Sequence, residues 1–270
     1  MALDRVVDSA VLDGALSATA NAIREKTGST ERIAWDEAKG FSDVIVDVYE
    51  AGKKAEYEAR WNAIHDSIEN FGCKNAFSGA PWTNDTFRPT RDIHTDSSYM
   101  MFRDSRIAGD LPAMLEEWGI QITFEPGIAM QYTFFGTKFT RLGVFDFSDC
   151  QHMNGCFSDS LELVTIDKII CNKNTKFTDA FDWLYALENI RFEGELANDG
   201  LNLQDCEKLS KASLESIVNV FSTTASFSAT LSKAAVDKAF ETSAGANDGS
   251  TSPEWLALKA TRPNVTILLA

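Results

Sequence analysis

The chain has 270 residues and carries 25 Lys and Arg against 40 Asp and Glu, which gives a formal net charge of −15. Such an excess of acids, without a visible Lys/Arg patch, argues against nucleic acid as a main ligand and against docking on anionic lipid. The hydrophobic fraction of 44% and the charged fraction of 24% are typical of a globular protein with a substantial core.

Two further bulk features concern the compartment and the cysteines. The sequence has no run of about 18 apolar residues, so we expect no membrane insertion. Its first residues, MALDRVVDSAVLDGAL, carry acids where a signal peptide needs a basic region, so we expect synthesis in a cytoplasm without a signal peptide. We interpret the cysteines, odd in number and without a CxxC pair, as reduced and buried. They are Cys73, Cys150, Cys156, Cys171 and Cys206.

Residues 1–72 are predicted to form a helical segment. Apolar residues at helical spacing predict one helix over 8–27 and a longer one over 42–71. The longer helix repeats apolar side chains at steps of 4, 3, 4 and 3, the spacing of a coiled-coil seam. The seam residues are Tyr57, Trp61, Ile64, Ile68 and Phe71. Because two heptads are short for a coiled coil, two interpretations stay open: a helix packed on its own domain, or an attachment and oligomerisation stalk that favours a trimer.

A repeated pattern fills residues 73–210. Phe77, Phe102, Phe134, Phe157 and Phe181 recur at intervals of 25, 32, 23 and 24 residues. Segments 142–147, 161–166 and 187–192 share the pattern L-x-x-Φ-x-Φ, where Φ is an apolar residue, so Leu161 is aligned with Leu142 and Leu187. The longest interval predicts one insertion around "LPAMLEEWG" (111–119), which is typical of a short helix.

The physical basis of such a unit is shared burial. The Φ-x-Φ residues form a short strand that shows alternate side chains to a core, and the upstream phenylalanine packs behind it. One unit cannot bury its apolar side alone, so neighbouring units stack on one another. The unit length and spacing fall within the range of leucine-rich repeats. We therefore expect residues 73–210 to form a leucine-rich-repeat-like solenoid within an α+β protein.

Residues 211–270 are predicted to form a small α/β cap at the C-terminus. The array ends in a last strand over Leu201–Leu203. Helices are expected over Ser213–Phe221, over Ala234–Phe240 with Ser232 as its cap, and over Pro253–Thr261. Strands are expected over 226–232 and 264–269. A hairpin-like pair of these two strands would protect the open edge of the array.

Three parts of the sequence resemble known proteins. "NAFSGAPW", "MNGCFSDSLELVTI" and "TDAFDWLYALENIRF" resemble the aromatic-rich, BspA-like class of leucine-rich repeats found in bacterial and phage surface proteins. "LSATANAIREKTGSTERIAWDEAKGFSDVI" and the C-terminal "LSKASLESIVNVFSTT" and "SPEWLALKATRPNVTI" resemble tail-associated proteins of phages and prophages of Gram-positive gut bacteria. The resemblance implies a virion component and carries over no catalytic residue. The chain departs from the usual repeat in its few "AFxxC" matches and its large insertion.

The residues that catalyse reactions or bind metals are scattered. His152 lies between Cys150 and Cys156 in "CQHMNGC", but a zinc site usually needs a second pair of ligands elsewhere, so we expect packing and no metal. Asp146 and Asp167 alternate with the apolar residues of expected strands, which places them on the outer face rather than in a glycosidase pair. We expect no catalytic residue and no cofactor.

Aromatic residues beyond those that the repeat needs are the better functional candidates. They are Trp82, Trp118, Trp183 and Tyr185. One interpretation is that Trp183 fills the volume behind its own strand. The other is that some of these rings are exposed and stack on sugars or on a partner protein, because rigid aromatic side chains dominate such contacts.

These features together predict a non-enzymatic structural protein of a phage virion, in the tail, baseplate or fibre. The expected partners are other virion proteins, further copies of the chain, and a glycan or protein of the host cell surface. Two alternatives stay open: a bacterial surface adhesin of BspA type, and a tail-associated enzyme that cleaves polysaccharide.

Overall fold

The computed structural model describes residues 73, 75–79, 82–85, 87, 89, 92–95, 97–124, 130–150 and 152–270. The chain divides into two units, Met1–Ala63 and Ile64–Ala270, and every described residue belongs to the second. The expected N-terminal helices and the seam from Tyr57 to Phe71 lie outside the described residues, so both stay predictions.

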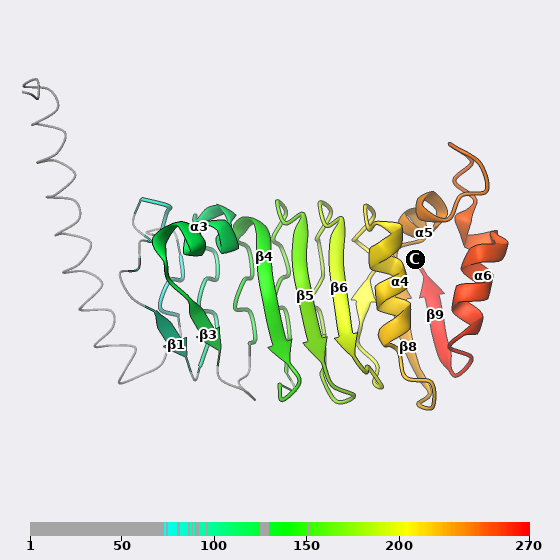
Figure 1. The fold of residues 1–270 in the computed structure, drawn as a ribbon, viewed down its shortest axis with the longest axis horizontal. Coiled ribbons are helices and arrows are strands. Elements are labelled where there is room, and N and C mark those ends of the chain that lie inside the picture. Colours follow the sequence, from blue (N-terminus) through cyan, green and yellow to red (C-terminus); the bar gives the residue numbers. More distant parts are fainter. Residues whose placement is uncertain are drawn as a thin grey trace, which may run out of the picture. The chain divides into compact units, whose positions relative to one another are not determined.

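The described part of the chain is a mixed α/β structure with nine strands and four α-helices (Figure 1). The strands are β1 (Ile93–Thr95), β2 (Ala108–Asp110), β3 (Ile122–Phe124), β4 (Lys138–Phe147), β5 (Thr165–Cys171), β6 (Asn189–Gly194), β7 (Asn202–Leu203), β8 (Phe227–Leu231) and β9 (Val265–Leu269). The helices are α3 (Leu111–Trp118), α4 (Lys211–Val220), α5 (Lys233–Ala239) and α6 (Pro253–Ala260), with a 3-10 turn over Gly249–Thr251. None of these helices is long and apolar enough to cross a membrane.

Every strand pair within the described ranges is parallel, and the strands form three sheets. Their strand orders are β1-β3, β2-β4-β5-β6 and β7-β8-β9. The prediction that the last two strands form a hairpin-like pair is wrong. Strands β8 and β9 pair in parallel from Phe227–Val265 to Leu231–Leu269, and the chain between them passes through α5 and α6. A parallel pair needs such a crossover, whereas a hairpin needs only a short turn.

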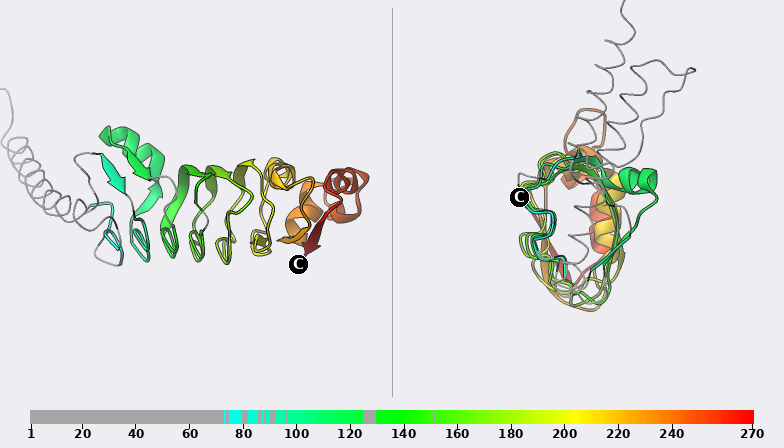
Figure 2. Two further views of the ribbon diagram at one scale, coloured as in Figure 1. Left: turned by 90° about the horizontal axis from the view of Figure 1, so that it is seen from below. Right: turned by 90° about the vertical axis from the view of Figure 1, so that its left-hand side faces the viewer.

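The core contains a column of five phenylalanines, here called the anchors: Phe77, Phe102, Phe134, Phe157 and Phe181. All five are fully buried. The ring centroids of successive anchors lie 5.2, 5.4, 6.0 and 5.7 Å apart. The prediction that these recurrent phenylalanines belong to the core is therefore confirmed. Figure 2 shows the turns that carry them following one another in chain order along one side of the described structure.

Each anchor lies in a turn with two left-handed residues. The residues two positions before the anchors have positive φ; they are Asn75, Met100, Tyr132, Gly155 and Asp179. The residues two positions after the anchors also have positive φ; they are Gly79, Asp104, Gly136, Asp159 and Trp183. From Phe77 to Phe157, each anchor N–H donates to the carbonyl immediately before the next anchor, at 2.8 to 3.1 Å. These bonds give neighbouring turns the same backbone path.

The alignment of segments 142–147, 161–166 and 187–192 expected from the sequence is wrong. The sheet pairs Leu142 with Ile166 and Ile166 with Ile190. Leu161 is therefore not equivalent to Leu142 or Leu187, and its side chain is 52% exposed. The register of β5 against β6 shifts between Ile166 and Ile169, so the inward residues are not spaced by two throughout. A strict alternation rule cannot place such a strand.

The predicted insertion helix is confirmed as α3. The side chain of Asp110 caps it by accepting from the N–H of Ala113 at 2.9 Å, and Pro112 lies in its first turn. Gly119 ends it in the left-handed conformation. After α3 the chain continues into β3, which pairs with β1.

Helix α4 covers the outer edge of β6. The hydroxyl of Ser213 accepts from the N–H of Ile190 at 3.0 Å and donates to the carbonyl of Glu188 at 3.0 Å. The hydroxyl of Ser216 accepts from the N–H of Phe192 at 2.7 Å and donates to the carbonyl of the same residue at 3.1 Å. Two serines three residues apart on one helix face therefore replace part of the next strand. The edge is protected by side chains rather than by a strand pair.

Candidate functional site

The four aromatic residues singled out in the sequence lie in different surroundings. Trp82 is only 8% exposed and meets Phe77 edge-on with ring centroids 5.2 Å apart, so it belongs to the core and not to a binding surface. Trp118 is half-buried at the end of α3, with its ring 6.0 Å from that of Phe87. Trp183 and Tyr185 are 50% and 48% exposed. They are the two that remain available to a partner.

The backbone of Trp183 is unusual for a bulky residue. Its φ is +60°, in the left-handed region that mainly glycine and asparagine or aspartate tolerate. The corresponding position of the earlier turns is occupied by such residues, namely Gly79, Asp104, Gly136 and Asp159. Because a bulky residue in this region costs free energy, the tryptophan needs a compensating contact or a function.

A side chain holds the backbone of Trp183 in place. In the preceding turn the N–H of Asp159 donates to the backbone carbonyl of Asp182 at 3.1 Å. The N–H of Trp183 instead donates to the carboxylate Oδ2 of Asp205 at 2.9 Å. The Asp205 carboxylate therefore takes the place of the backbone carbonyl that accepts the equivalent hydrogen bond in the preceding turn.

Carboxylates lie next to Trp183, because Asp182 precedes it in the chain and Asp205 accepts its backbone N–H. Burial raises the pKa of Asp182, and the negative charges of Asp179 and Asp205 raise it further. A carboxylate has more acceptor sites than the single hydrogen bond from Trp183 uses on Asp205, so further donors can bind there. The arrangement is suited to a ligand with hydrogen-bond donors and an apolar face.

A second aromatic group lies on earlier turns. We call Tyr99, Arg103, Tyr132 and Phe135 the aromatic–arginine cluster. The ring of Tyr132 meets those of Tyr99 and Phe135 edge-on, with centroids 6.5 and 5.9 Å away. The guanidinium of Arg103 lies 5.8 Å from the Tyr132 centroid and 5.1 Å from that of Phe135. These groups contact one another.

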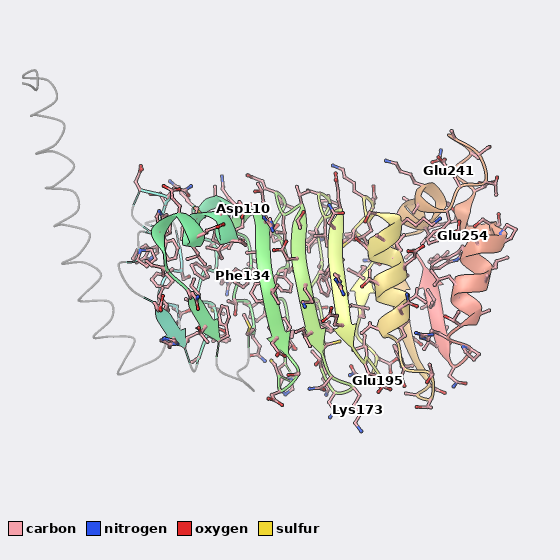
Figure 3. All side chains as sticks on the ribbon, in the orientation of Figure 1. Asp110, Phe134, Lys173, Glu195, Glu241 and Glu254 are labelled. Atoms are coloured by element: carbon pink, nitrogen blue, oxygen red, sulfur yellow. The ribbon has the colours of Figure 1, made fainter. Side chains whose placement is uncertain are left out.

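The outward face of the four-stranded sheet is charged. The guanidinium of Arg141 donates to both carboxylate oxygens of Asp167, at 2.8 and 2.9 Å, and to Asp110 at 3.2 Å. These hydrogen bonds, foremost that to Asp167, raise the pKa of Arg141. Figure 3 labels Asp110, together with Lys173 and Glu195 near the opposite ends of the strands. Exposed ion pairs of this kind add little stability, so this face is better described as a polar surface.

A groove of about 660 Å³ opens between the insertion and β4. Its apolar lining residues come from α3, β3 and β4 and include Leu111, Leu115, Phe124, Val144 and Phe145. Asp92 and Glu116 also line it. Its volume falls within the range of small-ligand sites.

The residues that could bind a metal or act as a nucleophile do not form a site in the described part of the chain. No group of three His, Cys, Asp or Glu is placed there to hold a metal ion. All five cysteines are buried. Burial raises the pKa of Cys171 to about 12 and also raises the pKa values of Cys156 and Cys206, so these thiols stay protonated and unreactive. His152 is exposed.

Comparisons with protein-family models, curated proteins and solved structures find no match to this chain. Sequence reasoning singled out Trp183 and Tyr185 but missed the hydrogen bond from the Trp183 N–H to Asp205 and the group that Asp205 forms with Asp179 and Asp182. It also missed the left-handed position of Trp183, although Gly and Asp in the corresponding turns were a signal for it.

Proposed function

We propose that the chain is a non-enzymatic structural protein of a phage virion, in the tail, baseplate or fibre, that presents a binding surface to a host or virion partner. In this proposal residues 73–210 form a leucine-rich-repeat-like solenoid and residues 211–270 cap it. One observation carries the binding role. Successive turns keep the same buried anchor, while the outward residue two positions later changes from Gly and Asp to Trp183. A constant interior with a variable exterior is the arrangement of a binding scaffold.

The assignment to a virion rests on the resemblance of the terminal segments to phage tail-associated proteins. In this proposal residues 1–72 attach the chain to other virion proteins and bring its copies together, with a trimer favoured. Several copies on one particle bind a surface together, so a weak single site is sufficient.

The non-enzymatic part of the proposal is supported by the positions of the carboxylates. Asp167 is engaged by Arg141 on the outer face of the sheet, and Asp146 lies exposed on the same sheet. A glycosidase needs two carboxyl groups about 5 to 10 Å apart that face one sugar. An assay of the purified protein on host cell-wall glycans tests this part, since release of reducing ends would contradict it.

The experiment for the main proposal uses purified virions. Antibodies against the chain should label the particle at one location, and mass spectrometry should detect the chain with the other tail proteins. Detection on the bacterial cell surface in the absence of phage genes would favour the adhesin instead.

The assembly role has its own test. Light scattering of the full chain at micromolar concentration should give an oligomer, and a double variant Ile64→Asp, Ile68→Asp should reduce it to a monomer. Charge placed in an apolar seam prevents helix association. A monomeric wild-type chain would contradict this role while leaving virion labelling to be judged separately.

A further inference from the structure

We propose that Trp183 and Tyr185 form a saccharide subsite, in which the Trp183 ring stacks on the C–H face of a sugar and the carboxylates of Asp182 and Asp205 accept hydrogen bonds from its hydroxyl or ammonium groups. This inference rests on the binding role proposed above and names the ligand class.

The rings of Trp183 and Tyr185 are not part of the buried core. Trp183 and Tyr185 are each about half exposed. In the described part of the chain neither ring contacts another aromatic ring or a cation. The anchor that belongs to the same turn, Phe181, is fully buried and stacks on Phe157. The core of this turn is therefore complete without the tryptophan ring.

Tyr132 has a similar backbone to Trp183 but different contacts. Tyr132 has φ +56° and Trp183 has φ +60°, so both are bulky residues in left-handed backbone. The Tyr132 ring contacts three neighbours of the aromatic–arginine cluster, which offsets the unfavourable backbone. The Trp183 ring has no corresponding contacts within the described residues. A bulky residue at a position otherwise filled by Gly or Asp is thus explained by a ligand.

Charge and shape indicate the class of ligand. A sugar ring offers an apolar C–H face that stacks on an aromatic ring, and its edge carries donors. Acceptors lie next to Trp183, since Asp205 accepts its N–H at 2.9 Å, Asp182 precedes it in the chain, and the negative charges of Asp179 and Asp205 act on Asp182. A positively charged ligand relieves this repulsion, a neutral one tolerates it, and an acidic one adds to it.

The apolar surface extends over two turns. The N–H of Glu188 donates to the carbonyl of Val164 at 2.9 Å, so the segment of Leu161 lies beside that of Tyr185. Leu161 is 52% exposed. A chain of sugars that runs along the turns can therefore contact Leu161 as well as the two rings. We conclude that amino-bearing oligosaccharides bind best, neutral ones less well and acidic ones least.

The test is calorimetric titration of the full-length chain with three oligosaccharides of equal length: a glucosamine oligomer, its N-acetylated neutral form and a polygalacturonate oligomer. The wild-type chain should bind them in that order. Trp183→Asn should weaken binding of the first two by about tenfold or more, as expected for loss of a central aromatic contact. Trp183→Tyr should retain affinity within about threefold, because a ring is kept.

Two more variants test the carboxylates and the location. Asp182→Asn should weaken binding of the glucosamine oligomer and leave the neutral oligomer nearly unchanged. Leu256→Asn, at a residue 52% exposed on α6, is the control and should change nothing. Each variant is used only if its urea unfolding midpoint is at least that of the wild-type chain. If Trp183→Asn does not meet this condition, Trp183→Gly replaces it.

The inference is overturned if Trp183→Asn binds like the wild type, if the wild type binds none of the three oligosaccharides, or if the acidic one binds best. The same proteins are also tested on intact host cells and for incorporation into virions. Cell binding that does not depend on Trp183 overturns the inference and leaves the proposed function standing. Saccharide binding by a chain that is absent from virions overturns the proposed function and leaves the inference standing.

Discussion

Tyr132 and Trp183 occupy two of the turns that carry the anchors, and they show two different uses of an unfavourable backbone conformation. Both are bulky residues with positive φ beside a fully buried anchor, Phe134 and Phe181. The Tyr132 ring is held by Tyr99, Phe135 and Arg103, whereas the Trp183 ring is half exposed. The backbone of the first turn is stabilised by local packing. The ring of the second contributes little to folding, so it is the better candidate for binding.

The two turns also differ in the group that accepts the hydrogen bond from the second left-handed residue. The turn of Tyr132 is bonded to the backbone of the next turn, since the N–H of Gly136 donates to the carbonyl of Ser158 at 2.9 Å. The turn of Trp183 relies on the side chain of Asp205. A substitution at Asp205 removes the side-chain hydrogen bond of the Trp183 turn, whereas no substitution removes the carbonyl of Ser158 that the Tyr132 turn uses. Mutation can therefore weaken one turn without the other.

The largest effect is expected for the anchor column that both turns share. Phe134→Ala removes a fully buried ring that stacks between Phe102 and Phe157, and should lower the free energy of unfolding by about 4 kcal/mol. Urea denaturation followed by circular dichroism measures it. A loss below about 1 kcal/mol would show that the column does not support the turns.

The packed turn should be sensitive to Gly155. A Cβ at this residue would lie 2.5 Å from Cε1 of Tyr132, and φ is +57°, so Gly155→Ala combines a clash with a left-handed alanine. We expect a loss of about 3 kcal/mol. The control is Gly143→Ala, whose Cβ would meet Cγ of Pro112 at 3.4 Å without positive φ, and which should cost less than about 1 kcal/mol. Equal losses for the two variants would contradict the close packing of Tyr132.

The same substitution at Tyr132 and at Trp183 measures how much each ring contributes to stability. Asparagine tolerates left-handed backbone, so each Asn variant tests mainly the ring. Tyr132→Asn should lower the free energy of unfolding by about 2 kcal/mol, because its ring contacts are lost. Trp183→Asn should change it by less than about 1 kcal/mol, because relief of the backbone offsets the half-buried ring. Losses of the same size would remove the distinction between the turns.

A smaller effect is expected where Asp205 completes the last turn. Asp205→Ala removes the acceptor of the Trp183 N–H and should cost about 1 kcal/mol. Asp205→Asn keeps an acceptor oxygen and should cost less. A thermal unfolding series of both variants checks the order, and equal losses would show that the charge of Asp205 matters more than the hydrogen bond.

The smallest effect concerns pH. The pKa of Asp182 is raised by burial and by Asp179 and Asp205, so the folded chain holds a proton there at a higher pH than the unfolded chain does. The contribution of Asp182 to stability therefore grows as the pH falls through its folded pKa. Asp182→Asn should raise the urea midpoint at neutral pH and gain less on acidification than the wild type. Asp149→Asn, at an exposed acid after β4, is the control. Identical wild-type and Asp182→Asn midpoints at neutral pH would contradict the shift.

The sequence predicted the parts of the fold that depend on large buried residues at regular intervals. The anchors, the insertion helix and the cap helices were recoverable because burial of phenylalanine and capping by Asp110 or Ser232 leave clear patterns. Strand register was not recoverable, because the exposed Leu161 fits the apolar pattern as well as a buried residue does, whereas the sheet pairs Leu142 with Ile166 and Ile166 with Ile190. The hairpin-like pair was wrong because the sequence does not show whether two strands run parallel.

The candidate site was predicted less well than the fold. Trp82 and Trp183 look alike in sequence, but Trp82 packs on Phe77 in the first turn and Trp183 is exposed in the last. Burial of a tryptophan depends on which neighbours the stacked turns bring to it. The contact between Trp183 and Asp205 joins residues 22 apart, and nothing in the local pattern indicates it.

The most direct measurement follows the indole of Trp183 in solution. The chain has six tryptophans, so 5-fluorotryptophan labelling should give six fluorine resonances, and the one missing from Trp183→Asn belongs to residue 183. On titration of the full-length chain with the glucosamine oligomer, that resonance should shift most, and the resonance of buried Trp82 should stay in place. A Trp183 resonance that stays fixed, at oligomer concentrations where another tryptophan shifts or none does, would contradict the claim that this ring is held outward for a ligand.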